Sequence, residues 1–260
     1  YDYLGNEALA TETENIWLDN MTPVIDNVLN GAFNGYVSAT TDNNTITLTI
    51  STDEELAAHD SAMPNIAAEA YAIAADFSEF YTVPEEFNAE DVTEVAYDAV
   101  TGTWIISYTV TGNNMVVDGN VDIEITATDV SGNVGTFTHT VILDNTAPTV
   151  TITETDDNYT TPLSGVYNFD SVIYARVEVA DANPSIDPAD LAFTVLTNEG
   201  VELDVVANGA ADMVRWNSVD GYFELEFMLD ANDADALNLY DTEATINVEV
   251  RDLALNVGTD

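Results

Sequence analysis

Apolar and polar residues alternate along much of this chain, and a period of two is typical of half-buried β-strands. The alternation is clearest over residues 121–127 and 245–250. Two further pairs of short apolar runs meet at Thr101-Gly102 and Asp220-Gly221, where glycine supplies the positive φ that a hairpin turn requires. The pattern therefore predicts a protein made mainly of short antiparallel strands.

A repeat of about 125 residues organises these strands. The sequence ATDVSGNVG at residues 127–135 recurs more loosely as VRDLALNVG at residues 250–258. A second marker, Leu-Asp-Asn-x-x-Pro, ends at Pro23 and again at Pro148, and proline suits a boundary because it cannot donate to a β-ladder. We predict three parts: an N-terminal strand or arm at residues 1–18, a first unit at residues 19–144 and a second unit at residues 145–260.

The first unit departs from the alternation over residues 53–80, where alanine is frequent. Pro64 stands where the first residue of a helix would, so we predict short helices near residues 53–59 and 64–77. At the corresponding place the second unit has only residues 187–193, which predict a single helical turn.

The predicted fold class is all-β: two tandem immunoglobulin-like (Ig-like) β-sandwiches, with a short helical insertion in the first. Seven or so short strands per unit and turns rich in Gly, Asn and Asp favour it. The sequence from Asp129 through a final strand to LDNTAPTV at residues 143–150 resembles the tandem Ig-like domains of bacterial and archaeal surface proteins, such as adhesin stalks and surface-layer proteins. The second unit departs from this motif, with Leu255 in place of its glycine. The resemblance implies an extracellular structural role.

The composition is strongly acidic. There are 48 Asp and Glu residues against 3 Arg, no Lys, Cys or Gln, and a formal net charge of −45, although 46% of the residues are hydrophobic. Three arginines cannot neutralise a phosphate backbone, which excludes nucleic acid and anionic membrane surfaces as partners. No stretch reaches the ~18 apolar residues of a membrane span, so no membrane insertion is expected. The expected partners are cations, because high salt or bound divalent ions would screen the repulsion. The cytoplasm of a salt-accumulating cell and the outside of a marine or halophilic cell would both provide such conditions.

The predicted topology brings several acids to the ends of the units. In an Ig-like sandwich the turn before the last strand, the loop after the second strand and the incoming linker share one pole. Converging oxygen donors suit Ca²⁺, which takes six to eight of them at ~2.3–2.6 Å. The candidate ligands are Asp19, Asn20, Asp53 and Asp129 for the first unit, and Asp144, Asn145, Asp181 and Asp252 for the second.

This arrangement resembles the calcium-rigidified linkers of cadherins and of some repetitive adhesins, although only the Asp-Asn-x-x-Pro portion of the cadherin link is present. In a competing interpretation, Asp129 and Asp252 only cap their own turns through the backbone.

Catalytic motifs do not occur in the sequence. There is no Gly-x-Ser-x-Gly, no His-Glu-x-x-His and no phosphate-binding glycine loop. Carboxylate pairs such as Glu85 and Glu86 are expected by chance in so acidic a chain. We therefore predict that the protein is not an enzyme.

One end of the sequence carries the kind of strand that the unit at the other end is expected to lack. Only residues 257–260 follow the Asp252 turn, whereas residues 136–143 predict a complete last strand in the first unit, so the second unit is expected to lack its own. Residues 11–18 have the length and apolar finish of such a strand. In one explanation they complete the second unit of a neighbouring copy and build a head-to-tail homopolymer. In the other, the chain is a slice of a longer array whose adjacent repeats supply the strand.

These observations lead to two functional hypotheses. The first is a structural extracellular protein, a subunit or repeat of a cell-surface filament or surface layer, assembled by β-strand complementation and stiffened by Ca²⁺ at its junctions. The alternative is a slice of a long adhesin stalk or a ligand-binding surface module.

Overall fold

The computed structural model describes twelve parts of the chain, and the predicted N-terminal arm (1–18) and most of the predicted helical segment (54–71) lie outside them. The described residues are 19–31, 35–53, 72–82, 92–98, 100–111, 115–129, 131–162, 165, 167–168, 171–209, 212–230 and 243–260.

The first unit is a sandwich of two four-stranded sheets. One sheet has the order β1 (Ile25–Asn30), β3 (Thr45–Thr52), β6 (Thr103–Thr109) and β5 (Val92–Asp98), all antiparallel. The other has the order β2 (Tyr36–Val37), β8 (Val134–Leu143), β7 (Gly119–Thr128) and β4 (Ile73–Asp76). Only the short β2 runs parallel to its neighbour, at the end of β8.

The second unit repeats this plan with a five-stranded and a four-stranded sheet. The first contains β13 (Val205–Ala207), β15 (Tyr222–Leu229), β10 (Ile173–Ala180) and β9 (Thr149–Thr155), with β14 (Val214–Asn217) also paired to β15. The second has the order β12 (Glu202–Leu203), β11 (Leu191–Thr197), β16 (Ala244–Arg251) and β17 (Val257–Thr259). The all-β prediction is confirmed, and the four sheets are consistent with two β-sandwiches.

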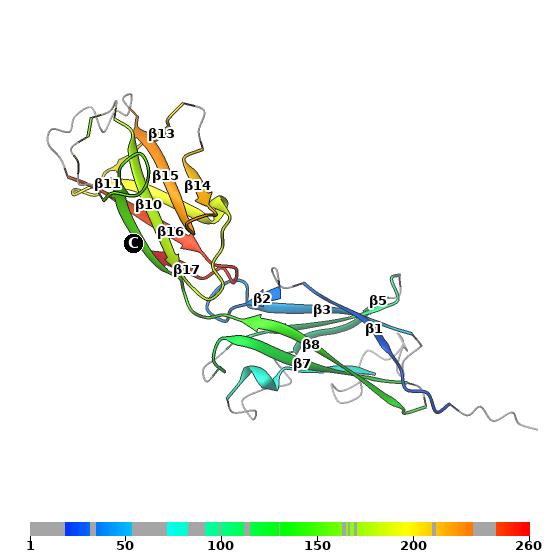
Figure 1. Ribbon diagram of the computed structural model, residues 1–260. Coiled ribbons are helices and arrows are strands. Elements are labelled where there is room, and N and C mark those ends of the chain that lie inside the picture. The colour runs from blue at the N-terminus through cyan, green and yellow to red at the C-terminus, as the bar shows by residue number, and fades with distance from the viewer. Residues whose placement is uncertain are drawn as a thin grey trace, which may run out of the picture.

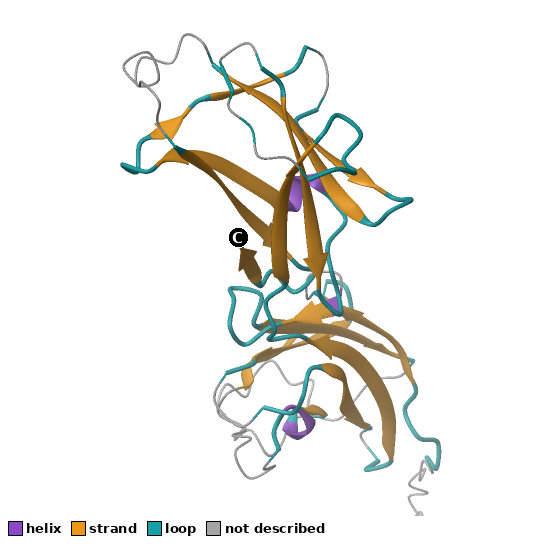
Figure 2. Ribbon diagram, turned by 60° about the vertical axis from the view of Figure 1, so that its left-hand side comes forward, coloured by secondary structure: helices purple, strands orange, loops and turns teal. Residues whose placement is uncertain are grey.

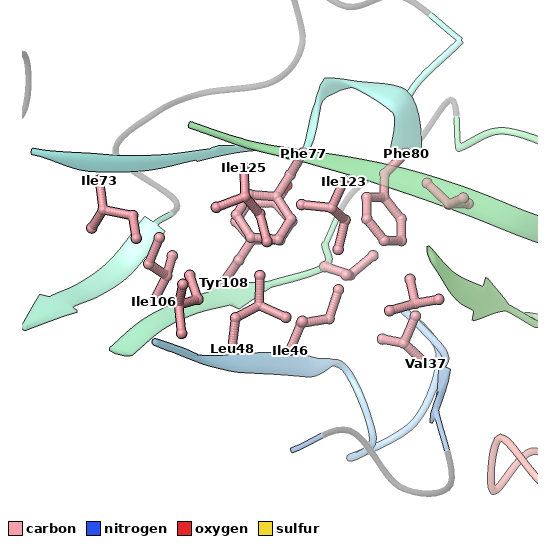
Figure 3. Packing of buried hydrophobic residues seen from close by; sticks show 14 of the residues in the cluster. Val37, Ile46, Leu48, Ile73, Phe77, Phe80, Ile106, Tyr108, Ile123 and Ile125 are labelled. Atoms are coloured by element: carbon pink, nitrogen blue, oxygen red, sulfur yellow. The ribbon is translucent and has the colours of Figure 1, made fainter. Parts of the chain in front are cut away.

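The apolar positions of the alternating strands face each other between the sheets. In the first unit Ile46 and Leu48 of β3 meet Ile123 and Ile125 of β7, and all four are buried (Figure 3). Each such side chain contributes about 1.5–3 kcal/mol relative to an exposed one. The second unit has a separate core, which includes Phe223 and Phe227 of β15.

Both hairpin turns lie where the pattern predicted them. Gly102 joins β5 to β6 with φ of 71°, and Gly221 joins β14 to β15 with φ of 76°. The predicted helical turn of the second unit is present as a 3-10 turn, Pro188–Asp190.

The helix predicted near residues 64–77 is wrong over its described part. Residues 73–76 form strand β4, which pairs with β7, and only the 3-10 turn Ser78–Phe80 follows. Alanine favours a helix by only tenths of a kcal/mol over most residues. Here pairing with the edge of β7 outweighs that preference and lets Ile73 and Phe77 enter the core.

The strands that close the two units differ in length. β8 pairs with β7 over ten residues, Val134–Leu143. For the second unit the sequence predicted no closing strand, and the structure places the three-residue β17 against Glu249–Arg251 of β16.

The two sandwiches lie end to end (Figures 1 and 2). The loop after β2 in the first unit contacts the turn between β16 and β17 in the second. Among the described residues, no helix combines the length and apolar character needed to cross a membrane.

Candidate cation site at the junction

The turn between β16 and β17 is organised by one carboxylate. Asp252 Oδ1 accepts hydrogen bonds from the backbone N–H groups of Ala254 (2.8 Å) and Asn256 (2.9 Å), and its Oδ2 accepts one from Asn256 Nδ2 at 2.9 Å. Asp252 is only 1% exposed. The local sequence thus fixes the carboxylate, as the turn-capping interpretation expected, and holds it at the pole that faces the first unit.

Two further carboxylates converge on Asp252. Asp181 follows directly after β10, and Asp144 lies in the linker between the units. Each of the three residues offers one carboxylate oxygen, and these oxygens all lie within 4.8 Å of one another. Asp144 and Asp252 are buried and Asp181 is half-buried. This buried group, which we call the junction triad, could hold a metal ion.

The electrostatics of the junction triad favour a cation. Burial raises the pKa of Asp252, and the nearby Asp144 carboxylate adds to that rise. Burial also raises the pKa of Asp181, with further contributions from Asp144 and Asp118. A positive ion would compensate the charges that burial and mutual repulsion destabilise.

Asp118 is an acid near this site that sequence reasoning missed. It precedes β7 in the first unit, and its carboxylate accepts hydrogen bonds from the N–H of Asn145 (3.0 Å) and from Thr146 Oγ1 (2.5 Å). It acts on Asp181 through its charge. Its position in the sequence could have pointed to it, because Asp118-Gly119 directly precedes the strand that leads to the Asp129 turn.

Asn256 connects the triad to the first unit. Its Nδ2 donates to Asp252 Oδ2 and to the backbone oxygen of Asp144, each at 2.9 Å. Its Oδ1 accepts from Ser38 Oγ and Thr40 Oγ1, each at 2.8 Å. Asn256 is 3% exposed. One buried amide therefore links the linker, the second unit and a loop of the first unit.

The other predicted ligand of this pole is oriented elsewhere. Asn145 Oδ1 accepts a hydrogen bond from the N–H of Ala39 at 2.8 Å. Its side-chain oxygen is thus engaged by the loop of the first unit. In its place Asn183 approaches the triad and donates from Nδ2 to Asp144 Oδ2 at 2.7 Å.

The four candidates of the first unit do not assemble in the same way. Asp129 caps its turn, accepting from the N–H groups of Ser131 and Asn133. Asp19 lies nearby and accepts from Ser131 Oγ at 3.4 Å, while Asp53 accepts from the N–H of Val24 at 2.8 Å. Asn20, beside Asp19, is exposed. Within the described part of the chain, Asp19, Asp53 and Asp129 form no group of the junction-triad kind.

The two turns also differ in electrostatics. At Asp129, burial opposes ionisation, but hydrogen bonds from the Asn133 side chain and from the turn amides outweigh it and lower the pKa. At Asp252, burial prevails over a matching set of hydrogen bonds and raises the pKa. Equivalent turns thus lower the pKa of the carboxyl in the first unit and leave it raised in the second.

The backbone of the second turn is strained where its sequence departs from the motif. Leu255 has φ of 68°, and Gly132 in the equivalent position of the first turn has φ of 88°. A side chain in this left-handed region costs roughly 1–2 kcal/mol. The match in conformation supports the alignment of Leu255 with the motif glycine.

Comparisons with known proteins give distant similarities only. No protein-family model matches the chain, and no curated protein sequence matches it. The structure is similar to the Yersinia pseudotuberculosis adhesin InvE, at 11% identity and a TM-score of 0.27, over 90% of this chain and 57% of that one. It is also similar to a tetra-tandem repeat in the extending region of a large adhesion protein, at 17% identity and a TM-score of 0.28, over 92% of this chain and 48% of that one.

A third similarity is to the human desmocollin-1 ectodomain, at 14% identity and a TM-score of 0.19, over 84% of this chain and 43% of that one. The chain spans about half the length of the first two structures. Values this low do not establish a shared function.

Proposed function

We propose that this chain is a pair of tandem Ig-like repeats from the stalk of a cell-surface adhesion protein, with a spacing rather than a catalytic role. In this proposal Ca²⁺ binds at the junction triad and fixes the second unit against the first. The observation that carries it is the origin of the site: Asp144 comes from the linker, Asp181 and Asp252 from the second unit, and Asn256 joins them to Ser38 of the first unit.

The chemistry of the donors supports a hard cation. Three carboxylates from Asp144, Asp181 and Asp252 offer oxygen only, and neither cysteine nor histidine lies in the group. Oxygen donors suit Ca²⁺ and Mg²⁺ over zinc or copper. Ca²⁺ is favoured because it tolerates irregular geometry and the six to eight ligands that water and neighbouring oxygens would complete, whereas Mg²⁺ requires a near-ideal octahedron.

The arrangement of the units supports a stalk. Two sandwiches placed end to end give an extended shape (Figure 1). A formal net charge of −45 makes adjacent surfaces repel one another unless cations screen or bind them. A cation at the joint would therefore favour the extended, ordered form, and the partners at the ends of the pair would be adjacent repeats.

A melting experiment tests the calcium site. We expect Ca²⁺ to raise the melting temperature relative to chelator, because a ligand that binds only the folded state adds about 2.7 kcal/mol at 100 times its dissociation constant. Asp252→Asn and Asp181→Asn should abolish most of the increase. Asp212→Asn is the matched control, since it removes one exposed charge in the second unit outside the triad. An increase that survives Asp252→Asn would exclude the triad as the site.

Small-angle X-ray scattering tests the joint itself. With Ca²⁺ we expect the distance distribution of one extended particle, and with chelator a broader one, because the carboxylates of the triad then repel one another. Mg²⁺ at the same concentration distinguishes specific binding from screening. Identical scattering in Ca²⁺ and in chelator would mean that no cation fixes the joint.

Assembly into a filament or surface layer is a second candidate function. The observation that favours it is the edge of β16: residues 244–247 pair with β11 on one side and, within the described part of the chain, with no strand on the other. A donated strand, such as residues 11–18 of a second copy, would extend the sheet there. Electron microscopy of the purified protein at millimolar Ca²⁺ tests this, and monodisperse single particles would exclude self-assembly.

A further inference from the structure

The pole of the first unit that lies away from the junction repeats the hydrogen-bonded frame of the junction. Asn133 Nδ2 donates to Asp129 Oδ2 at 2.7 Å and to the backbone oxygen of Asp19 at 3.3 Å. Asn256 Nδ2 makes the equivalent bonds to Asp252 and Asp144. Each unit therefore presents an asparagine held by its own turn and by its incoming linker.

The outward side of the two asparagines differs. Because Nδ2 of Asn133 is committed to two acceptors, its Oδ1 must point the other way, and no described residue donates to it. Oδ1 of Asn256, by contrast, accepts from the hydroxyl groups of Ser38 and Thr40. Within the described part of the chain, the first pole thus has the same acceptor without the donors.

Burial at the two turns shows the same contrast. Ala254 is 0% exposed, and Thr41 Oγ1 donates to its backbone oxygen at 3.2 Å. Ser131, at the equivalent position of the first turn, is exposed. Met21 in the adjoining linker is 73% exposed. The loop of the first unit covers the second pole, and no described residue covers the first in that way.

We propose that the pole formed by Asp19, Met21, Ser131 and Asn133 is a docking surface for a second Ig-like unit that presents a Ser-x-Thr loop like residues 38–40. This inference rests on the proposed tandem-repeat function and adds the chemistry of the partner. Two hydroxyl donors on such a loop satisfy Asn133 Oδ1, as Ser38 and Thr40 satisfy Asn256 Oδ1 at the junction.

A free second copy of this chain is not the partner. Its Ser38 and Thr40 hydroxyls already donate to its own Asn256. The partner is an adjoining unit whose loop is unoccupied. This joint also differs from the junction described above, because Asp53 bonds to Val24 and the described residues bring no third carboxylate to Asp19 and Asp129. Docking here is therefore independent of Ca²⁺.

An extended chain provides the test: residues 19–143 placed directly before residues 19–260, so that an added first unit precedes the original one. Asp19 then follows Leu143, as Asp144 does in the natural repeat. We expect Asn133→Ala in the middle unit to lower its melting temperature at least twice as much in the extended chain as in the original chain. The own-turn bonds of Asn133 are lost in both chains and cancel in this comparison.

A second variant approaches the contact from the partner's side. Ser38→Ala with Thr40→Val in the added unit removes both donors without touching the Asn133 turn, and should lower the melting temperature of the middle unit and broaden the scattering distance distribution. The same changes in the middle unit act instead on the Asn256 junction and are the control.

All measurements are repeated in chelator. Effects that persist there support this inference even if the calcium site fails, and effects that vanish overturn it. Equal losses from Asn133→Ala in the two chains, or no effect of the added-unit variant, also overturn it.

Discussion

The backbone oxygen of Pro148 lies 2.0 Å from the point at which a Cβ on Gly258 would stand. Pro23 and Gly135 have the same relationship in the first unit, at 1.9 Å. In both units the linker backbone therefore occupies the space that any side chain at the glycine would need. This contact explains why the Asn-Val-Gly sequence accompanies the Asp-Asn-x-x-Pro sequence in each repeat.

Gly258→Ala should lower the free energy of unfolding of the second unit by about 1–3 kcal/mol, because the added methyl group forces the backbone to move. Calorimetry measures the loss. Gly31→Ala is the matched control, since its Cβ would lie 3.3 Å from the Thr47 oxygen and a small shift relieves the contact. Similar losses in the two variants would contradict the close-approach explanation.

Asn256→Ala should destabilise the second unit by about 1–3 kcal/mol, because it leaves buried partners without hydrogen bonds. A double-mutant cycle with Ser38→Ala should show coupling between the units, as expected for residues in contact. Thr259→Ala, on the exposed face of β17, is the control. Additive effects of Asn256→Ala and Ser38→Ala would mean that their contact contributes nothing to stability.

Asp118→Asn should weaken Ca²⁺ binding about three- to tenfold, or about 0.6–1.4 kcal/mol. The variant keeps the shape of a residue that holds Asn145 and Thr146 but removes its negative charge near the triad. Isothermal titration calorimetry gives the affinity. Asp122→Asn, which changes an exposed acid on the adjoining strand β7, should leave the affinity unchanged. A loss of the same size from both variants would point to net charge rather than to the site.

The polar cluster around Glu226 should give a pH-dependent contribution to stability. Hydrogen bonds from Asn208 and then Arg215 lower its pKa. A carboxyl whose pKa is lower in the folded than in the unfolded protein stabilises above its unfolded pKa of ~4.3, and this stabilisation is lost as the pH falls through the folded pKa.

Melting curves of the protein and of Glu226→Gln between pH 3 and 7 measure this contribution. The difference between them should be largest near pH 7 and shrink on acidification. The background effect of the other acids cancels in the difference. A difference that does not change with pH would show that the charge of Glu226 is not involved.

The repeat made much of this structure predictable. The strands could be predicted from alternating apolar and polar residues, and the hairpin turns from Gly102 and Gly221. Both features depend only on a few neighbouring residues. The meeting of Asp144, Asp181 and Asp252 at one pole was predictable from topology, since linker, loop and turn share that end of the sandwich.

Side-chain direction was not predictable from topology. Asp53 occupies the position after its strand that Asp181 occupies after β10, yet it turns back to Val24. Asn145 follows Asp144, but its side-chain oxygen accepts a hydrogen bond from the N–H of Ala39. In each case a nearby backbone N–H offers a hydrogen bond, and sequence spacing does not show which donors lie within reach. The helix prediction for the alanine-rich stretch was wrong for a related reason, because pairing with the edge of β7 decides the conformation of residues 73–76.

The parallel pairing of β2 with β8 gives the first unit a mechanical property. The chain enters this sandwich at one end and leaves it at the other (Figure 1), and Tyr36–Val37 pair with Ile142–Leu143 next to the exit. Tension along the chain slides these two strands lengthwise past each other, so their bonds must rupture together instead of opening one by one. If such units form a stalk, this shear contact beside the joint would therefore resist its extension under flow or traction.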